Sequence, residues 1–180
     1  MKIEKKTRNC FISYHHNNDQ DYLTELREVV KSMKVSDYSL KNDIGHLTNE
    51  TIYNKVRNKM RTCSVTVIII GERTGHRKWI DWEIWASLRG YNHPTDRKKS
   101  FKPNGLLAIF LPGNNHSIPE RLQDNIDSEY AVCMRWRNLE RDFESKVNYA
   151  YWKRNNAKEK IRNNRQRQES NSINFLGFKI

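Results

Sequence analysis

The chain has 180 residues and a net charge of +12, and its length suffices for one domain with a core of its own and some additional secondary structure. Its three cysteines are an odd number without CxxC spacing, which argues against a disulfide framework or a zinc site. The longest apolar run, residues 65–70, is far too short to span a membrane, and the basic start, residues 1–8, precedes only a short strand rather than the apolar stretch of a signal peptide, so we expect a cytoplasmic protein.

The first part of the chain predicts two strands around a helix. Residues 10–14 are a short apolar run with β-prone side chains, and apolar residues recur at helical spacing between residues 19 and 32. Residues 35–38 are a candidate second strand. They lead into a polar loop over residues 39–50, which we expect to gate or complete a binding site.

The middle of the chain contains the clearest strand pattern. A helical pattern over residues 52–60 precedes residues 65–70, a continuous run typical of a central parallel strand that is buried on both faces. A loop over residues 71–78 leads into a predicted helix over residues 79–89, which Gly90 ends.

The last part of the chain predicts two more strands and a long helix. Residues 92–104 are polar and basic, as in an exposed loop, and residues 106–111 predict the next buried strand. Residues 118–127 are expected to be irregular or a short turn, and residues 130–134 the last strand. A long, charged helix is predicted for residues 139–167.

The C-terminal region carries half of the charge excess. The last thirty residues account for +6 of the net charge of +12. Such a region can meet phosphate, anionic lipid or an acidic partner, although a solvated helix face is its more common role. We therefore distinguish a domain at residues 1–138 from a C-terminal helical extension and tail at residues 139–180, packed on that domain or projecting from it.

Strands that alternate with helices predict an α/β protein. The order of elements indicates a flavodoxin-like three-layer fold with a mostly parallel five-stranded sheet, in the order 2-1-3-4-5, plus the long basic C-terminal helix. Ligands of such sheets bind outside the carboxyl ends of the strands, near the switch point between strands 1 and 3. That rule gathers residues 13–17, 37–48 and 71–83 around one crevice.

Three segments together resemble a known family. Residues 10–14 read CFISY, similar to the first strand of TIR domains. Residues 61–74 read RTCSVTVIIIGERT, and residues 77–84 read RKWIDWEI. In this order and at this short distance, they resemble the bacterial and archaeal TIR-like family that includes the TIR-like component of Thoeris anti-phage defence. The resemblance covers roughly residues 9–136.

The resemblance implies that NAD is a substrate, with no separate cofactor. TIR enzymes cleave the bond between nicotinamide and ribose, and Thoeris TIR proteins make an ADP-ribose-derived messenger, often a cyclic ADP-ribose isomer, that activates a separate effector protein. Their key acid is the Glu of a Trp-x-x-x-Glu pattern, which Trp79 and Glu83 match here. A homo-oligomer and a phage-derived trigger are also implied.

Glu83 suits this chemistry as the catalytic residue. The ribose becomes an oxocarbenium ion as nicotinamide leaves, and a carboxylate beside the sugar can stabilise that charge. Asp81 cannot assist it, because residues two apart on a helix point about 200° apart, whereas Trp79 shares the face of Glu83. The alternative is that Glu83 is merely an acid favoured by the dipole of a helix N-terminus.

The candidate substrate-binding residues lie where the first two strands end and where the Trp-x-x-x-Glu pattern starts. They are Phe11, Ser13, Tyr14, His15, Asp37, Tyr38, Ser39 and Trp79. An aromatic ring there could stack on a base or on nicotinamide, although Phe11 and Trp79 also suit core packing and residues 37–39 an ordinary turn. The adjacent side chains of His15 and His16 diverge, so we expect no metal site.

Two other functions stay open. A non-catalytic TIR-like adaptor would assemble with other proteins through the helix at residues 79–89 and the loop at residues 39–50. A nucleic-acid-associated protein would use the basic C-terminal helix, although aromatic residues accompany its charges only near its start, at Tyr149, Tyr151 and Trp152. We expect no membrane partner.

Overall fold

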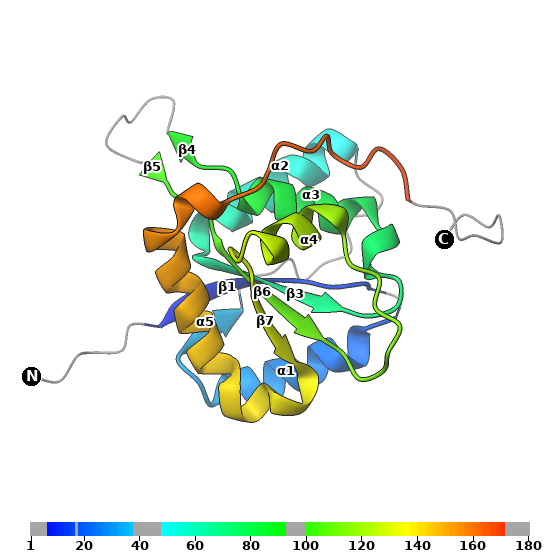
Figure 1. Cartoon of the computed structure of the whole chain (residues 1–180), viewed down its shortest axis with the longest axis vertical. Helices are drawn as coiled ribbons and strands as arrows, with labels where there is room; N and C mark the ends of the chain where they lie inside the picture. Colours follow the sequence, from blue (N-terminus) through cyan, green and yellow to red (C-terminus); the bar gives the residue numbers. More distant parts are fainter. Residues whose placement is uncertain (1–6, 17, 38–47, 93–99, 172–180) are drawn as a thin grey trace, which may run out of the picture.

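Five parallel strands form the central sheet in the computed structural model, which describes residues 7–16, 18–37, 48–92 and 100–171 (Figure 1). They are β1 (Arg8–Ser13), β2 (Val35–Asp37), β3 (Val65–Ile70), β6 (Gly105–Phe110) and β7 (Val132–Arg135). The sheet order is β2-β1-β3-β6-β7, and every neighbouring pair is parallel. The predicted flavodoxin-like order is therefore confirmed.

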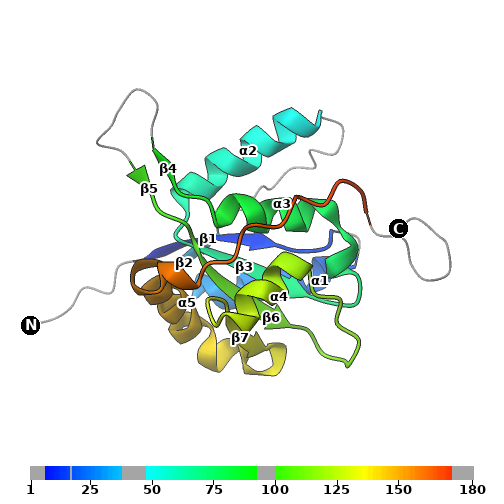
Figure 2. The same cartoon turned by 45° about the horizontal axis from the view of Figure 1, so that its top comes forward.

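Helices cover both faces of this sheet (Figures 1 and 2). They are α1 (Gln20–Lys31), α2 (Asn49–Thr62), α3 (Lys78–Ser87), α4 (Glu120–Asp127) and α5 (Leu139–Asn156), with short 3-10 turns η1 (Thr74–His76), η2 (Trp136–Asn138) and η3 (Lys158–Lys160). The helices α1 and α5 pack on one face, and α2, α3 and α4 on the other. No helix within the described ranges is long and apolar enough to cross a membrane.

The unbroken apolar run of β3 is buried on both faces of the sheet. Successive side chains of a strand point to opposite faces. Accordingly, Val67 and Ile69 belong to the apolar cluster under α1 and α5, whereas Ile68 and Ile70 belong to the cluster with α3 and α4. Gly105 at the start of β6 allows α5 to lie close, because a Cβ there would be 2.1 Å from the carbonyl oxygen of Ala150.

The last helix is shorter than predicted. It ends at Asn156 rather than near residue 167, and the side-chain amides of Asn155 and Asn156 donate to carbonyl oxygens four residues earlier, which satisfies acceptors of the final turn. After η3, residues 161–171 have neither helix nor strand structure and cross α3 and α4 (Figures 1 and 2). We call these eleven residues the strap.

Two further segments differ from their sequence predictions. Residues 118–127 were expected to be irregular, yet Glu120–Asp127 form α4, whose inner face carries Arg121, Leu122 and Asn125. The predicted loop at residues 92–104 includes part of a short antiparallel pair, β4 (Tyr91–Asn92) and β5 (Ser100–Phe101). Most of the predicted 39–50 loop lies outside the described residues.

Candidate active site

A folded-back loop brings α3 to the carboxyl ends of β1 and β3. The hydroxyl of Thr74 accepts from the backbone N–H of Gly71 at 2.8 Å and donates to the carbonyl of Ile69 at 3.3 Å. Gly71 lies close to the start of α1, since a Cβ at this position would be 3.0 Å from Oδ1 of Asp19 and would push that side chain aside. The chain therefore turns sharply after β3, and α3 begins at Lys78.

Glu83 meets the end of β1 through one short hydrogen bond. Oγ of Ser13 donates to Oε2 of Glu83 at 2.5 Å, and the Ser13 side chain is buried. One turn later on the same helix face, the Ser87 hydroxyl donates to the backbone carbonyl of Glu83 at 2.8 Å. The Asp81 carboxylate instead pairs with Arg121 at 2.8 Å, so the two acids of α3 point apart.

Burial makes the Glu83 carboxyl a weaker acid than usual. Removal from water raises its pKa from 4.5 to about 7, and the hydrogen bond from Ser13 opposes that rise. Near neutral pH, the carboxyl is therefore close to its titration midpoint. A cation bound beside Glu83 would favour the ionised form, because opposite charge lowers the pKa of an acid.

Two further polar side chains near the end of β1 are buried without full hydrogen bonding. His15 is 2% exposed, and neither of its ring nitrogens has a partner among the residues that the structure describes. Burial, together with the positive charges of Arg77 and Arg73, lowers the pKa of His15 from 6.5 to about 4. Oδ2 of Asp19 also has no partner in the described part of the chain, and burial raises the pKa of that carboxyl.

Such unsatisfied groups are rare in folded proteins and mark candidate sites. His15 was predicted from its place after the first strand. Asp19 is not among the predicted site residues. It occupies the N-cap position of α1, but its side chain makes no cap hydrogen bond there. No pattern in the sequence distinguishes this Asp from an ordinary cap.

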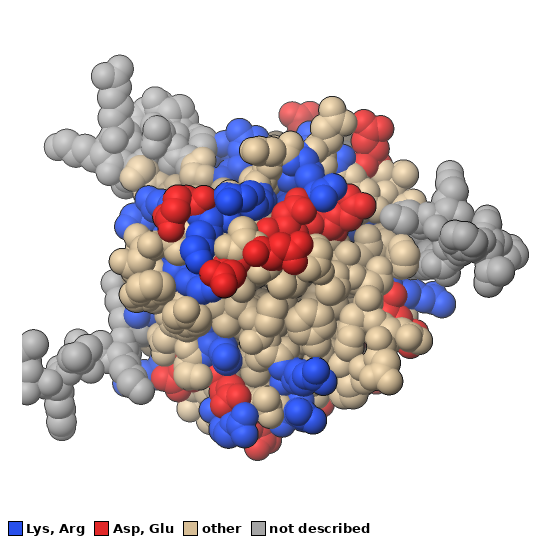
Figure 3. All heavy atoms as spheres, in the orientation of Figure 1, with Lys and Arg blue, Asp and Glu red and all other residues tan. Residues whose placement is uncertain are grey.

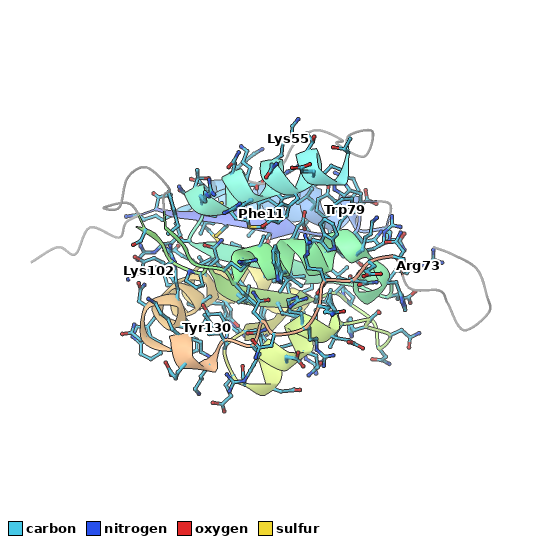
Figure 4. All side chains as sticks on the ribbon, turned by 90° about the horizontal axis from the view of Figure 1, so that it is seen from above. Phe11, Lys55, Arg73, Trp79, Lys102 and Tyr130 are labelled. Atoms are coloured by element: carbon cyan, nitrogen blue, oxygen red, sulfur yellow. The ribbon has the colours of Figure 1, made fainter. Side chains whose placement is uncertain are left out.

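The other predicted site residues lie partly in the core and partly near Glu83. Burial raises the pKa of Tyr14, and the nearby charges of Glu83 and Asp37 add to that rise. Phe11 is buried in the apolar cluster beneath α2 and α3, and Trp79 packs partly buried against that cluster (Figure 4). The Tyr14 hydroxyl contacts Nδ1 of His16 at 2.9 Å. Asp37 pairs with Arg27 at 2.8 Å.

The structure thus brings Ser13 together with Glu83, and it places Trp79 one helical turn before Glu83. Phe11 packs among apolar side chains of the core and has no polar atom to offer a ligand. Tyr38 and Ser39 lie outside the described residues.

Known proteins resemble this chain in sequence and in structure. The family model described as Thoeris protein ThsB, TIR-like domain, matches residues 11–116, more than half of the chain. Among solved structures, the TIR domains of the activated Roq1 resistosome, which directly recognises the pathogen effector XopQ, align with a TM-score of 0.42 and 12% identity, over 83% of this chain and 84% of that one. The matched segment of the family model includes Ser13, His15 and Glu83. The chain therefore belongs to the ThsB family of Thoeris TIR-like domains.

Proposed function

We propose that this protein cleaves the nicotinamide–ribose bond of NAD and makes an ADP-ribose-derived messenger, a cyclic ADP-ribose isomer, that activates a separate effector in antiviral defence. The observation that carries the proposal is the short hydrogen bond that holds the Glu83 carboxyl against Ser13, at the edge of the sheet where ligands of such folds bind. Membership of the family suggests NAD as the substrate.

The reaction needs few groups from the protein. When the C–N bond breaks, its electron pair passes to the nicotinamide nitrogen, which loses its positive charge, and the ribose carbon becomes cationic. The ionised Glu83 stabilises that carbon. Water, or a group of the same substrate in the cyclic reaction, then attacks the carbon and releases a proton, and a carboxyl with a pKa of about 7 can accept it.

The remaining groups of the site suit the rest of the substrate. A neutral His15 offers one hydrogen-bond donor and one acceptor, both without a partner among the described residues. Arg73 and Arg77 lie near enough to His15 to depress its pKa, and the same positive field would attract the diphosphate of NAD. Trp79 would border the nicotinamide side. Contacts from Tyr14 and residues 37–39 to the adenosine half stay predictions.

Release of nicotinamide tests the proposal. We expect purified full-length protein to release nicotinamide from NAD, and Glu83→Gln to slow that release about 100- to 1,000-fold, because the amide carries no charge to stabilise the ribosyl cation. Glu140→Gln, a change at an exposed acid on α5, is the matched control and should keep the wild-type rate. Equal rates in the wild type and Glu83→Gln would remove Glu83 from the mechanism.

Assembly and triggering are part of the same proposal. A site completed by a second copy of the chain would show a specific activity that rises with protein concentration. If a phage component is the trigger, extracts of infected cells that express the wild type should accumulate the cyclic product, and those with Glu83→Gln should not. Absence of product from infected wild-type cells would contradict the proposal.

The basic C-terminal region gives little support to nucleic-acid binding. Lys160 pairs with Glu129 at 2.6 Å, and Arg165 pairs with Asp124 at 2.5 Å and with Glu120 at 2.8 Å. Basic and acidic side chains accordingly adjoin along the band where the strap crosses α3 and α4 (Figure 3). Charges engaged in this way are poorly placed to contact phosphates.

A further inference from the structure

The strap contacts the first turns of the helix that carries Glu83. The side-chain oxygen of Asn171 accepts from the backbone N–H of Lys78 at 3.1 Å, at the start of α3. The backbone of Gln168 makes two more contacts, accepting from Nε1 of Trp82 at 2.7 Å and donating to Asp81 at 2.9 Å. Because the N-cap residue of α3 makes no side-chain cap bond, Asn171 supplies an acceptor that the helix otherwise lacks.

A buried arginine on α4 holds the strap to α3. The side chain of Arg121, on α4, is fully buried and pairs with Asp81 at 2.8 Å. Its remaining donors bind the strap: the side chain of Asn163 at 2.9 Å, and the carbonyl oxygens of Arg165 at 3.0 Å and Gln166 at 2.9 Å. A buried guanidinium with all these partners holds the strap in one register.

A second arginine links the strap to two helices at once. The guanidinium of Arg167 lies 4.4 Å from the ring centre of Trp82 and 4.7 Å from that of Trp85, both on α3. It also lies 5.6 Å from the ring of Tyr53 on α2. Cation–π contacts of this kind are each worth about 0.5–2 kcal/mol. Arg167 thereby ties together α2 and α3, two of the three helices that cover the face of the sheet where Glu83 lies.

These contacts matter because α3 is short. A helix of ten residues has little stability of its own and takes its position from what it packs against. On one side, Glu83 reaches Ser13; on the opposite side, Asp81 and Trp82 are held by the strap. A shift of the strap would therefore move the first turns of α3 and loosen the contact between Glu83 and Ser13.

We infer that the strap positions Glu83, and that Arg167 and Arg121 are positioning residues that set the place of α3 without touching the substrate. The inference rests on the proposed function only where it predicts a change in NAD cleavage. The effect of the strap on the Glu83 carboxyl is independent of any substrate. Displacement of a catalytic group by about 1 Å can cost up to about 100-fold in rate, so loosening of the strap should lower kcat more than it changes KM.

A pair of strap variants in the full-length protein tests the inference. Arg167→Ala removes the link to α2 and α3. Arg162→Ala is the matched control, because within the described part of the chain the Arg162 guanidinium binds only the nearby carbonyls of Glu159 and Ile161. We would follow the titration of the Glu83 carboxyl by ¹³C NMR, assigned with Glu83→Gln, and the hydrogen exchange of the α3 amides.

Arg167→Ala should lower the titration midpoint of Glu83 by about one pH unit, because water reaches the loosened carboxyl. Exchange of the α3 amides should rise about tenfold, and kcat should fall about tenfold at nearly constant KM. Arg162→Ala should match the wild type. An unchanged midpoint and unchanged exchange in Arg167→Ala would overturn the inference, with or without NAD cleavage. Shifts in both readouts, in a protein that never cleaves NAD, would keep the role of the strap and reject the proposed function.

Discussion

Buried polar groups on the two sides of α3 differ in how fully they are hydrogen-bonded and paired. On the side of the strap, Asp81 and Arg121 find partners for their charges and for most of their hydrogen-bonding atoms. On the side of the sheet, among the described residues, the Glu83 carboxyl accepts one hydrogen bond, and His15 and Asp19 keep buried atoms without a partner. A buried polar group without a partner costs about 1–3 kcal/mol. The strap side therefore stabilises the fold, whereas the sheet side keeps costly buried polar groups, a cost that the proposed NAD chemistry would explain.

Removal of Arg121 should have the largest effect on stability. Arg121→Ala leaves Asp81 buried without its counter-charge and leaves two strap carbonyls without donors. We expect the free energy of unfolding to fall by about 3–5 kcal/mol, measured by urea unfolding followed by circular dichroism. Arg137→Ala, at an exposed position, should change it by less than about 0.5 kcal/mol. A loss below about 1 kcal/mol for Arg121→Ala would mean that the strap side is not the stabilising one.

Glu83→Gln should change stability in the opposite direction. The folded-state pKa of about 7 lies above the ordinary value of 4.5, so the folded protein binds this proton more tightly than the unfolded chain does. Ionisation of Glu83 therefore costs stability as pH rises from about 4.5 to 7, and the full cost is present above pH 7. The uncharged amide avoids that cost.

Glu83→Gln should consequently be more stable than the wild type by about 3 kcal/mol at pH 8, and by less than about 1 kcal/mol at pH 5. Chemical unfolding of both proteins at the two pH values measures the difference. An equal gain at both values would point to packing rather than to titration. A variant that is more stable and also inactive is the signature of a group kept for chemistry.

The sequence predicted the sheet side of this comparison better than the strap side, for a physical reason. The buried strands and the direction of Glu83 follow from periods of 2 and 3.6 residues, which are local properties of the chain. The same geometry separates Asp81 from Glu83. The two side chains do diverge, one to Arg121 and the other to Ser13.

The strap could not be predicted because its partners are distant along the chain. Arg121 and Asp81 lie 40 residues apart, and Gln168 lies 87 residues from Asp81. A charged, Asn-rich sequence fits a solvated helix as well as it fits an extended segment, and only those distant contacts decide between them. The helix α4 was missed although Ile118, Leu122 and Ile126 recur every four residues, and its inner face also carries the polar side chains of Arg121 and Asn125.

A change at His15 should have the smallest of these effects on stability, and it tests the sheet side of α3 directly. Its pKa of about 4 lies below the ordinary 6.5, so it contributes stability that is fully present above pH 6.5 and is lost as pH falls towards 4. The loss at pH 5 should be about 2 kcal/mol. In His15→Leu, this loss should be absent, and comparison with the wild type at pH 7.5 and pH 5 isolates it because Glu83 titrates in both proteins.

The same variant connects stability to function. Leucine has no atoms that can bind NAD through hydrogen bonds, so His15→Leu should raise KM for NAD about tenfold, which corresponds to about one lost hydrogen bond. At pH 7.5, the variant should be no less stable than the wild type, since it removes two buried nitrogens that lack partners in the described structure. Lower stability at pH 7.5 together with an unchanged KM would mean that these nitrogens serve the fold, and the contrast between the two sides of α3 would then rest on Glu83 and Asp19 alone.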